Sequence, residues 1–450
     1  MKIKKKVPII VLIFVVMLFP FNSTRNIRSK AATVKLGEEV TFFVATDTHY
    51  LASDLTDNGE AFQTFVNEGD GKQLTYIQEI MNAFENDIEK KNPNVLVISG
   101  DLTSNGEKKG HLEFAKRLEE IEKLGTSVYV IPGNHDILNP YARRFEGRNQ
   151  YKTDYISPKD FSNIYKNFGY KEAISKDETT LSYLAAPSEE VWLLMLDTAK
   201  YENNIDLGHP ELNGRIASET LNWIKQCSDL AKSKDAEIIA VMHHNLLNHS
   251  SNITKGFTID NSEEVIELFK QCDINLALSG HIHLQDIKSN EDVEKPIYDI
   301  ATGCISVYPQ KYGILKYSRN DGINYITESV DVEGWSKEVG IVDENINNFN
   351  KTSKTFYGDR LYSKIMSRLA ITDLYTEEEL NLMADTYRTL YLRYYEGMRE
   401  IATEEIKNSP GFKLWLNNEF APSQKNVIRL ANTHGENNNN LFISNKKTSN

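Results

Sequence analysis

Five short clusters of histidine, aspartate and asparagine stand out in this sequence of 450 residues. In chain order they read Asp-Thr-His at 47–49, Gly-Asp at 100–101, Gly-Asn-His-Asp at 133–136, His-His at 243–244 and Gly-His-Ile-His at 280–283. Six of the ten histidines lie in these clusters. Carboxylate, imidazole and amide oxygen donors without a thiolate suit divalent transition metals, so the clusters predict metal chemistry.

The number of donors indicates two metal ions rather than one. The seven candidate ligands are Asp47, His49, Asp101, Asn134, His243, His281 and His283. If one carboxylate bridges the two ions, each ion has four protein ligands and keeps coordination positions for water and substrate. Asp101 is the natural bridge, because it is the lone candidate from its loop.

Each cluster directly follows a short apolar run that predicts a buried strand. The predicted strands are residues 40–46, 95–99, 127–131, 191–196, 237–242 and 274–278, and helical patterns occupy 74–90, 111–124, 218–232 and 262–271. Residues 298–307 and 313–331 predict an antiparallel continuation of the sheets. This alternation indicates an α/β fold, in which loops at the carboxyl ends of strands meet at one crevice.

After about residue 340 the sequence changes character. Residues 343–353 are Asn-rich and predict a linker, whereas Thr376 and Glu379 form a capping-box pattern at the start of a helix. The tyrosines that follow at helical spacing, among them Tyr387, Tyr391 and Tyr394, favour a packing face over a ligand platform. We therefore expect a helical domain over 341–428 and a disordered tail over 429–450, after a catalytic domain over 32–340.

The first 31 residues have the layout of a secretory signal: a basic start, an apolar run and small residues before Ala32. We expect the protein to be secreted, with a retained N-terminal membrane anchor as the alternative and no stable membrane span in the rest. Without these residues the chain has 44 basic and 64 acidic residues, a net charge of −20. So acidic a chain is not a general nucleic-acid binder. The oligomeric state is left open.

The remaining histidines and the cysteines carry weaker signals. His111, on a predicted helix, and His209 and His249, in polar loops, are expected at the surface without a catalytic role. Cys227, Cys272 and Cys304 have no metal-binding spacing and predict buried thiols, with one disulfide as the alternative.

The five clusters, in this order, resemble the calcineurin-like metallophosphoesterase superfamily. The resemblance implies a four-layer αββα sandwich, an α/β (α+β) fold, with a small C-terminal helical domain here. By matching positions, Asp47, His49, Asp101 and His283 would hold one ion, and Asp101, Asn134, His243 and His281 the other. Two such ions clamp the phosphoryl group and make hydroxide available near neutral pH.

Other residues of the clusters would contact the substrate. The resemblance implies that His135 stabilises the phosphate or protonates the leaving group and that Asp136 orients it; capping of a turn is the alternative for Asp136. Asn134 would touch both metal and substrate. For His244 a substrate or second-layer role and plain packing both remain open.

The expected metals are Mn²⁺ or Fe²⁺, with Zn²⁺ as a further possibility. Purple acid phosphatases are similar but have a tyrosine three residues after the Gly-Asp aspartate, where this chain has Ser104. A tyrosine-bound ferric ion is therefore not expected.

Gly100-Asp101-Leu102-Thr103, the His243-His244-Asn245 block and the helical extension resemble the class III cyclic-nucleotide phosphodiesterases. This implies hydrolysis of a cyclic nucleotide or a related small phosphodiester. The alternatives are a broad-specificity extracellular phosphomonoesterase or nucleotidase, and a non-enzymatic scaffold, which would not need its metal ligands.

Overall fold

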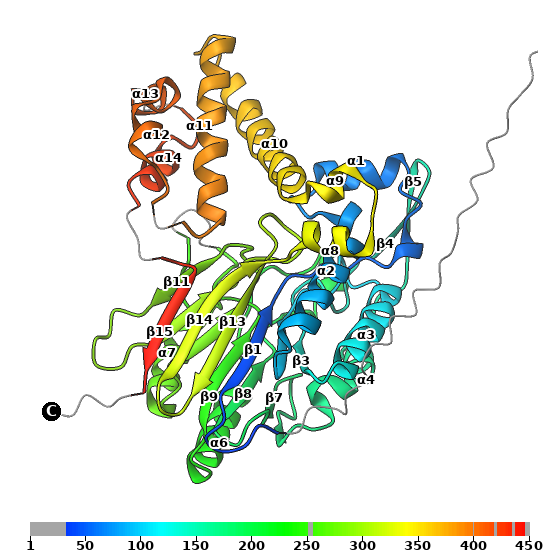
Figure 1. Ribbon diagram of the computed structural model, residues 1–450, viewed down its shortest axis with the longest axis vertical. Helices are drawn as coiled ribbons and strands as arrows, with labels where there is room; N and C mark the ends of the chain where they lie inside the picture. Colours follow the sequence, from blue (N-terminus) through cyan, green and yellow to red (C-terminus); the bar gives the residue numbers. More distant parts are fainter. Residues whose placement is uncertain (1–32, 251–254, 399, 418–420, 434–436, 446–450) are drawn as a thin grey trace, which may run out of the picture.

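The computed structural model describes residues 33–250, 255–398, 400–417, 421–433 and 437–445. Its centre is a pair of facing β-sheets with helices outside both (Figure 1). This arrangement confirms the expected four-layer sandwich. The proposed signal segment, residues 1–31, lies outside the described residues.

The first sheet has six strands, three of which are parallel neighbours at one side of the sheet. Its order is β15 (Asn440–Ser444), β14 (Gly322–Ser329), β13 (Lys311–Ser318), β1 (Val40–Ala45), β2 (Val95–Ser99) and β3 (Ser127–Ile131). β1, β2 and β3 pair in parallel, and the other strands pair antiparallel. β2 and β3 are buried along their whole length, as strands covered on both faces should be.

The second sheet has seven strands around a parallel centre. Its order is β11 (Asp286–Ser289), β12 (Tyr298–Ala301), β10 (Leu276–Ser279), β9 (Glu237–Met242), β8 (Val191–Leu196), β7 (Tyr183–Ala185) and β6 (Ser175–Lys176). β8, β9, β10 and β12 are parallel neighbours. A separate hairpin, β4 (Arg143–Glu146) with β5 (Asn149–Lys152), was not predicted because most of its residues are exposed.

The apolar run of β8 buries side chains on both faces of the second sheet. Val191, Leu193 and Met195 join the core between the sheets, whereas Trp192, Leu194 and Leu196 pack toward the helices. Because side chains alternate across a strand, six consecutive apolar residues can bury both faces. The outer helices are α2 (Ile77–Lys91) and α3 (Lys108–Lys123) on the first sheet, and α6 (Ser218–Ser233) and α7 (Ser262–Cys272) on the second.

The C-terminal helices lie beyond the upper ends of the strands and form a second core together with a few residues of the catalytic domain (Figure 1). They are α10 (Phe349–Ala370), α11 (Glu377–Tyr395), α12 (Glu404–Asn408), α13 (Pro410–Leu416) and α14 (Gln424–Ala431). α11 begins with the expected capping box of Thr376 and Glu379. Shorter helices are α1 (Glu60–Glu68), α4 (Pro158–Ile164), α5 (Asn204–Leu207), α8 (Val332–Val339) and α9 (Glu344–Asn347).

Two expectations for this region were wrong. Residues 343–353 are not a linker but contain α9 and the start of α10, whose first turns bury Ile346 and Phe349. The tail is not disordered throughout, because Asn440–Ser444 pairs with β14 as an antiparallel edge strand. Leu441 and Ile443 of this strand pack on the main core, which outweighs the polar composition around them.

Candidate metal centre

The carboxyl ends of β1, β2, β3, β9 and β10 meet at one edge of the sandwich, beneath the C-terminal helices. At this edge, the loops that follow the strands of one sheet contact the loops of the other sheet. The His281 N–H donates to Asp47 Oδ2 (2.9 Å), and the His243 Nδ1–H donates to the Ser99 carbonyl oxygen (2.9 Å). All five sequence clusters are therefore brought together.

Five of the seven proposed ligands have a left-handed backbone. The φ angles are 52° at Asp47, 42° at His49, 49° at Asp101, 68° at His281 and 57° at His283. Left-handed residues other than glycine are uncommon and concentrate at functional sites. The sharp turns allow each short loop to direct its side chain back into the crevice.

One group of donor atoms surrounds Asp47. His283 Nε2 lies 3.3 Å from Asp47 Oδ1, and His49 Nε2 lies 3.7 Å from the same oxygen. The two imidazole nitrogens are 3.1 Å apart, and His49 Nε2 is also 3.7 Å from Asp101 Oδ2. These atoms converge as ligands of a common ion would.

A second group surrounds the other oxygen of Asp101. His243 Nε2 lies 3.4 Å from Asp101 Oδ1 and 3.2 Å from Asn134 Oδ1. His281 belongs to the same cluster and donates its Nε2–H to the Gly256 carbonyl oxygen (3.0 Å), which leaves Nδ1 as the available donor atom. Asp101 occurs in both groups, as a bridging ligand must.

The donor set fits metal ions on three grounds. Asp47 Oδ1 is buried and has no hydrogen-bond donor among the described residues. Such an orphaned carboxylate oxygen is costly without a cation. The carbonyl bonds of His243 and His281 fix their ring orientation, which is the usual arrangement behind metal-bound histidines. Burial lowers the pKa of His281 to about 3 and so favours the neutral imidazole that metal binding requires, whereas at His243 burial is outweighed by Asp101, which raises the pKa to about 9.

His135 is held beside this centre by neighbours that differ from the expected one. Its Nδ1 lies 3.0 Å from the Ser104 carbonyl oxygen and 3.1 Å from Asn105 Oδ1. Its Nε2 lies 4.0 Å from Asp101 Oδ2, and the side chain is 23% exposed to the cleft above. A donated Nδ1–H therefore leaves Nε2 as the atom that faces the substrate.

Asp136 does not orient His135. Its carboxylate accepts backbone hydrogen bonds from Leu102, Thr103 and Gly133 at 2.8–3.1 Å. It therefore ties together the loops after β2 and β3, which agrees with the alternative of a turn cap. Its expected role as the partner of the imidazole is wrong for this geometry.

His244 is also not placed to touch substrate. The residue is fully buried, and its ring nitrogens contact Thr198 Oγ1 (2.8 Å) and the Leu212 carbonyl oxygen (3.2 Å). Its ring packs 4.4 Å from that of His281. It therefore supports a proposed ligand from behind.

Two histidines that were expected at the surface are buried. His111 bonds to Tyr165 Oη (2.8 Å) and the Asp136 carbonyl oxygen (2.9 Å). His249 lies between Asp286 Oδ2 (2.9 Å) and Asp299 Oδ2 (3.0 Å). His209 is exposed as expected. Whether a histidine is buried depends on which loop covers it, and this tertiary contact cannot be predicted from the neighbouring residues in the sequence.

Sequence reasoning missed several residues around the centre. Lys72 pairs with Asp70 (3.2 Å). Burial and then the charge of Lys72 lower the pKa of His135 to about 4. Cys304, one of three buried free thiols, donates to the Asp47 carbonyl oxygen (3.0 Å). None of these residues belongs to a motif, and the signal for Lys72 is limited to the Gly-Asp-Gly run at 69–71 that directly precedes it.

A cleft of about 1090 Å³ opens above the centre. Asp101, His135, His281 and His283 lie on its floor, and side chains of α10 and α11 form its wall. A smaller cavity of about 340 Å³ lies on the other side of His135, near Lys72 and Arg143. The C-terminal helices therefore line the site directly.

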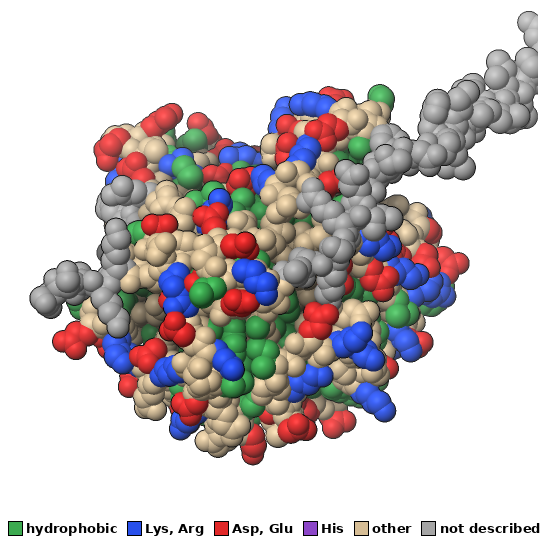
Figure 2. All heavy atoms as spheres, turned by 60° about the horizontal axis from the view of Figure 1, so that its bottom comes forward, with side chains coloured by type: hydrophobic (Ala, Val, Ile, Leu, Met, Phe, Trp, Pro, Cys, Tyr) green, Lys and Arg blue, Asp and Glu red, His purple; other side chains and the backbone are tan. Residues whose placement is uncertain are grey.

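On the face in Figure 2, acidic and basic side chains are interspersed. Among the described residues, no helix combines the length and apolar character needed to cross a membrane.

The family model of the calcineurin-like phosphoesterases matches residues 40–285, which is more than half of the chain. The protein therefore belongs to the calcineurin-like phosphoesterases, a class of metal-dependent phosphoester hydrolases. A second family model, the C-terminal domain of cyclic nucleotide phosphodiesterase, matches residues 331–439. This range contains α8 to α14, and the expected helical domain, 341–428, lies inside it.

Similar solved structures include a dimetal phosphatase from Danio rerio, with 14% identity and a TM-score of 0.44, covering 64% of this chain and 95% of that one. The TT1561 protein of Thermus thermophilus has 12% identity and a TM-score of 0.34, with 62% and 94% covered. Among curated proteins, none matches this chain.

Proposed function

We propose that this protein is a dinuclear metal-dependent phosphodiesterase that hydrolyses cyclic nucleotides or related small diesters. The observation that carries the proposal is the C-terminal helical domain. It matches the C-terminal domain of cyclic nucleotide phosphodiesterase and lines the cleft above both donor groups. Its position indicates that the substrate extends beyond the phosphate.

Both donor groups would be occupied in the active protein. Asp47, His49, Asp101 and His283 would hold one ion, and Asp101, Asn134, His243 and His281 the other. When bound, the ions would supply Lewis-acid stabilisation of the phosphate and lower the pKa of water. Mn²⁺ or Fe²⁺ suits these ligands, with Zn²⁺ as a further candidate.

His135 would handle the leaving group. Because Nδ1 is held by the Ser104 carbonyl oxygen and Asn105, the ring is fixed with Nε2 toward the cleft. An anionic phosphate beside it favours the imidazolium form, which can donate a proton to the departing oxygen. Asn105 is a positioning residue for this step.

The deciding assay is hydrolysis, with Mn²⁺, of 3′,5′-cyclic AMP, bis(4-nitrophenyl) phosphate and 4-nitrophenyl phosphate. We expect cleavage of the cyclic nucleotide and the diester, with little cleavage of the monoester. Diester cleavage with an inert cyclic nucleotide would restrict the proposal to other diesters. Preference for the monoester would replace it with the phosphomonoesterase alternative.

His135→Ala tests the assignment of roles. We expect an unchanged metal content, a loss of about 10²–10⁴-fold for diesters with alkoxide leaving groups, and a much smaller loss for nitrophenolate. Nitrophenolate departs without a proton, so it does not need the imidazole. The measurements are kcat for both substrate types and elemental analysis. An emptied metal site in His135→Ala would show that His135 is a ligand.

A further inference from the structure

α10 presents three basic side chains to the cleft, at four-residue spacing. Arg360, Lys364 and Arg368 lie on one face of the helix, because residues four apart are neighbours there. All three line the same cavity as His281 and His283. We define them as the basic stripe.

No carboxylate among the described residues forms an ion pair with the basic stripe. Among the described residues, neither Lys364 nor Arg368 forms an ion pair, and Arg360 donates to the carbonyl oxygens of Val66 (3.4 Å) and Asn67. Burial, and then the charges of Arg368 and Arg360, lower the pKa of Lys364. Like charges at four-residue spacing destabilise a helix. In a chain with a net charge of −13, a basic row without ion pairs that lines the cleft of the metal centre is suited to bind an anion.

Two acidic side chains that line the cleft near the stripe, Asp70 and Asp359, have basic partners elsewhere, whereas Glu68 forms no ion pair among the described residues. Asp70 pairs with Lys72 (3.2 Å), and Asp359 lies 3.5 Å from Arg388 Nη1. Asp70 also acts electrostatically on His283 and His135 and on Lys364 and Arg360. It therefore lies between the metal centre and the stripe, which makes these two parts of one cleft.

Tyrosines of α11 form an aromatic surface along the same cleft. Tyr391, Tyr394 and Tyr395 line it, with ring centroids 6.4 Å apart for the first pair and 5.9 Å for the second. Phe257 lies at the metal end, 4.8 Å from the ring of His281. Aromatic faces of this kind stack on nucleobases without selecting a sequence. The tyrosines therefore combine packing within the helical domain with a surface open to a ligand.

We propose that the basic stripe is a second anion site, which binds a phosphate of the substrate other than the one that is cleaved. The inference rests on the proposed diesterase function and defines its substrate class: a nucleotide diester that carries an additional phosphate. The cleft volume of about 1090 Å³ exceeds the usual range of about 300–1,000 Å³ for a drug-sized ligand, so there is room for both groups.

The test uses two chromogenic diesters that differ in one group. Thymidine 5′-(4-nitrophenyl phosphate) and its 3′-phosphorylated form have the same scissile bond and leaving group. For the wild-type protein with Mn²⁺ we expect kcat/KM to be about 10–100-fold higher for the 3′-phosphorylated compound. Charge-assisted hydrogen bonds between the basic stripe and the 3′-phosphate would give an increase of this size. Lys364→Ala/Arg368→Ala should remove this preference and change the plain compound by less than about twofold.

Lys351→Ala is the matched control, because Lys351 is exposed on the same helix but lines a different depression. The Lys351→Ala variant should keep the preference for the 3′-phosphorylated compound. Equal losses on both compounds in the double variant, or no preference in the wild-type protein, would overturn the inference. Activity on the plain compound shows that the variant is folded.

Binding separates this inference from the proposed function. Thymidine 3′,5′-bisphosphate, measured by calorimetry, should bind the double variant about 10-fold more weakly than the wild-type protein. Equal affinities would overturn the second anion site even if no diester were hydrolysed. Absence of diester hydrolysis with a clear difference in affinity would instead overturn only the diesterase proposal.

Discussion

At the residue scale, the metal centre is built from backbone conformations that other positions avoid. Each left-handed residue costs of order 1 kcal/mol, and five of the proposed ligands carry this cost. The sheets on either side hold the loops in place. Gly133 and Gly280 allow the close approach, since a Cβ atom would lie 2.2 Å from Asp101 Oδ1 and 1.9 Å from Thr46 Oγ1 respectively.

His249 makes stability depend on pH. Burial alone would lower its pKa, but Asp299 and Asp286 outweigh burial and raise the pKa to about 9. The folded state therefore binds this proton more tightly than the unfolded state. The stabilisation is complete below about pH 6.5 and is lost as the pH rises through about 9.

His249→Gln should therefore destabilise the protein by about 3 kcal/mol at pH 6, because it leaves two buried carboxylates without their cation. The difference from wild type should shrink between pH 7 and 10. Equilibrium unfolding across this range measures it, with His209→Gln at the exposed histidine as the control. A difference that is constant with pH would show that His249 is not the charged partner.

At the element scale, the central strands of the catalytic domain could be predicted almost to the residue, whereas β6, β7, β11 and the β4–β5 hairpin were not predicted. β2, β3, β8 and β9 have the predicted bounds, because runs buried on both faces and followed by polar clusters leave little ambiguity. The same strand ends predicted which loops would meet. Contacts between the loops, such as those of Asp136 and His244, could not be predicted, because they depend on the conformations of neighbouring loops in the same sheet.

α10 was missed although its pattern is present. Tyr357, Leu361, Ile365 and Leu369 are buried at four-residue spacing, but the Asn-rich start of the helix was interpreted as a linker. β15 was missed because an edge strand with one buried face needs only two apolar residues. Both elements are stabilised by tertiary packing, which composition does not report.

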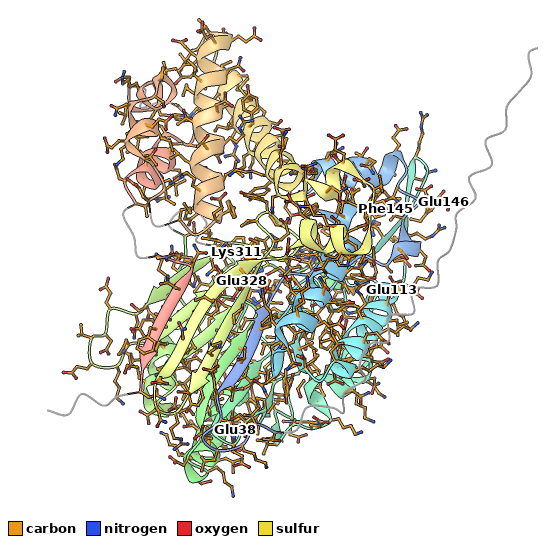
Figure 3. The ribbon with its side chains drawn as sticks, viewed as in Figure 1. Glu38, Glu113, Phe145, Glu146, Lys311 and Glu328 are labelled. Atoms are coloured by element: carbon orange, nitrogen blue, oxygen red, sulfur yellow. The ribbon has the colours of Figure 1, made fainter. Side chains whose placement is uncertain are left out.

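Asn439, just before β15, connects the tail to both parts of the protein. Its Oδ1 accepts from Lys311 Nζ (2.7 Å), and its Nδ2 donates to the Glu396 carbonyl oxygen (3.1 Å). Figure 3 shows Lys311 at the junction of the sheet and α11. Asn439→Ala should cost about 1–3 kcal/mol, because part-buried partners lose their bonds.

The expected signature of Asn439→Ala is faster hydrogen exchange in β15 and at the end of α11, with β2 and β3 unchanged. Asn432→Ala serves as the control, since Asn432 is an exposed residue after α14. If exchange rises equally in β2, or in neither β15 nor α11, Asn439 does not connect the helices to the sheet.

At the scale of the whole molecule, the site depends on three separate parts. Each sheet supplies one side of the donor groups, and the C-terminal domain covers them. Tyr357 of α10 fits closely against Gly71 in the catalytic domain, where a Cβ atom would lie 2.5 Å from its ring. The core of the helical domain also includes Cys304 and Val307 of the catalytic domain. The cleft is therefore a fixed feature of the fold.

Because the two sheets meet at the donor groups, metal ions should stabilise the whole protein. Without them the carboxylates of Asp47 and Asp101 are buried close together, and the charge of each disfavours the charge of the other. Ions that bind the folded state alone add about 4 kcal/mol per site at a free concentration 1,000 times Kd. We expect Mn²⁺ to raise the Tm of the EDTA-treated protein by several degrees.

Asp101→Asn separates this effect from nonspecific binding, since Asp101 belongs to both donor groups. The variant loses a bridging charge but keeps its size, so its Tm should respond much less to Mn²⁺ and its metal content should fall below two ions per chain. Asp197→Asn, at another buried carboxylate that follows a strand, should respond like wild type. If Mn²⁺ raised the Tm of Asp101→Asn as much as that of the wild-type protein, the stabilising ions would bind elsewhere. The donor groups would then not contribute to the stability of the sandwich through metal binding.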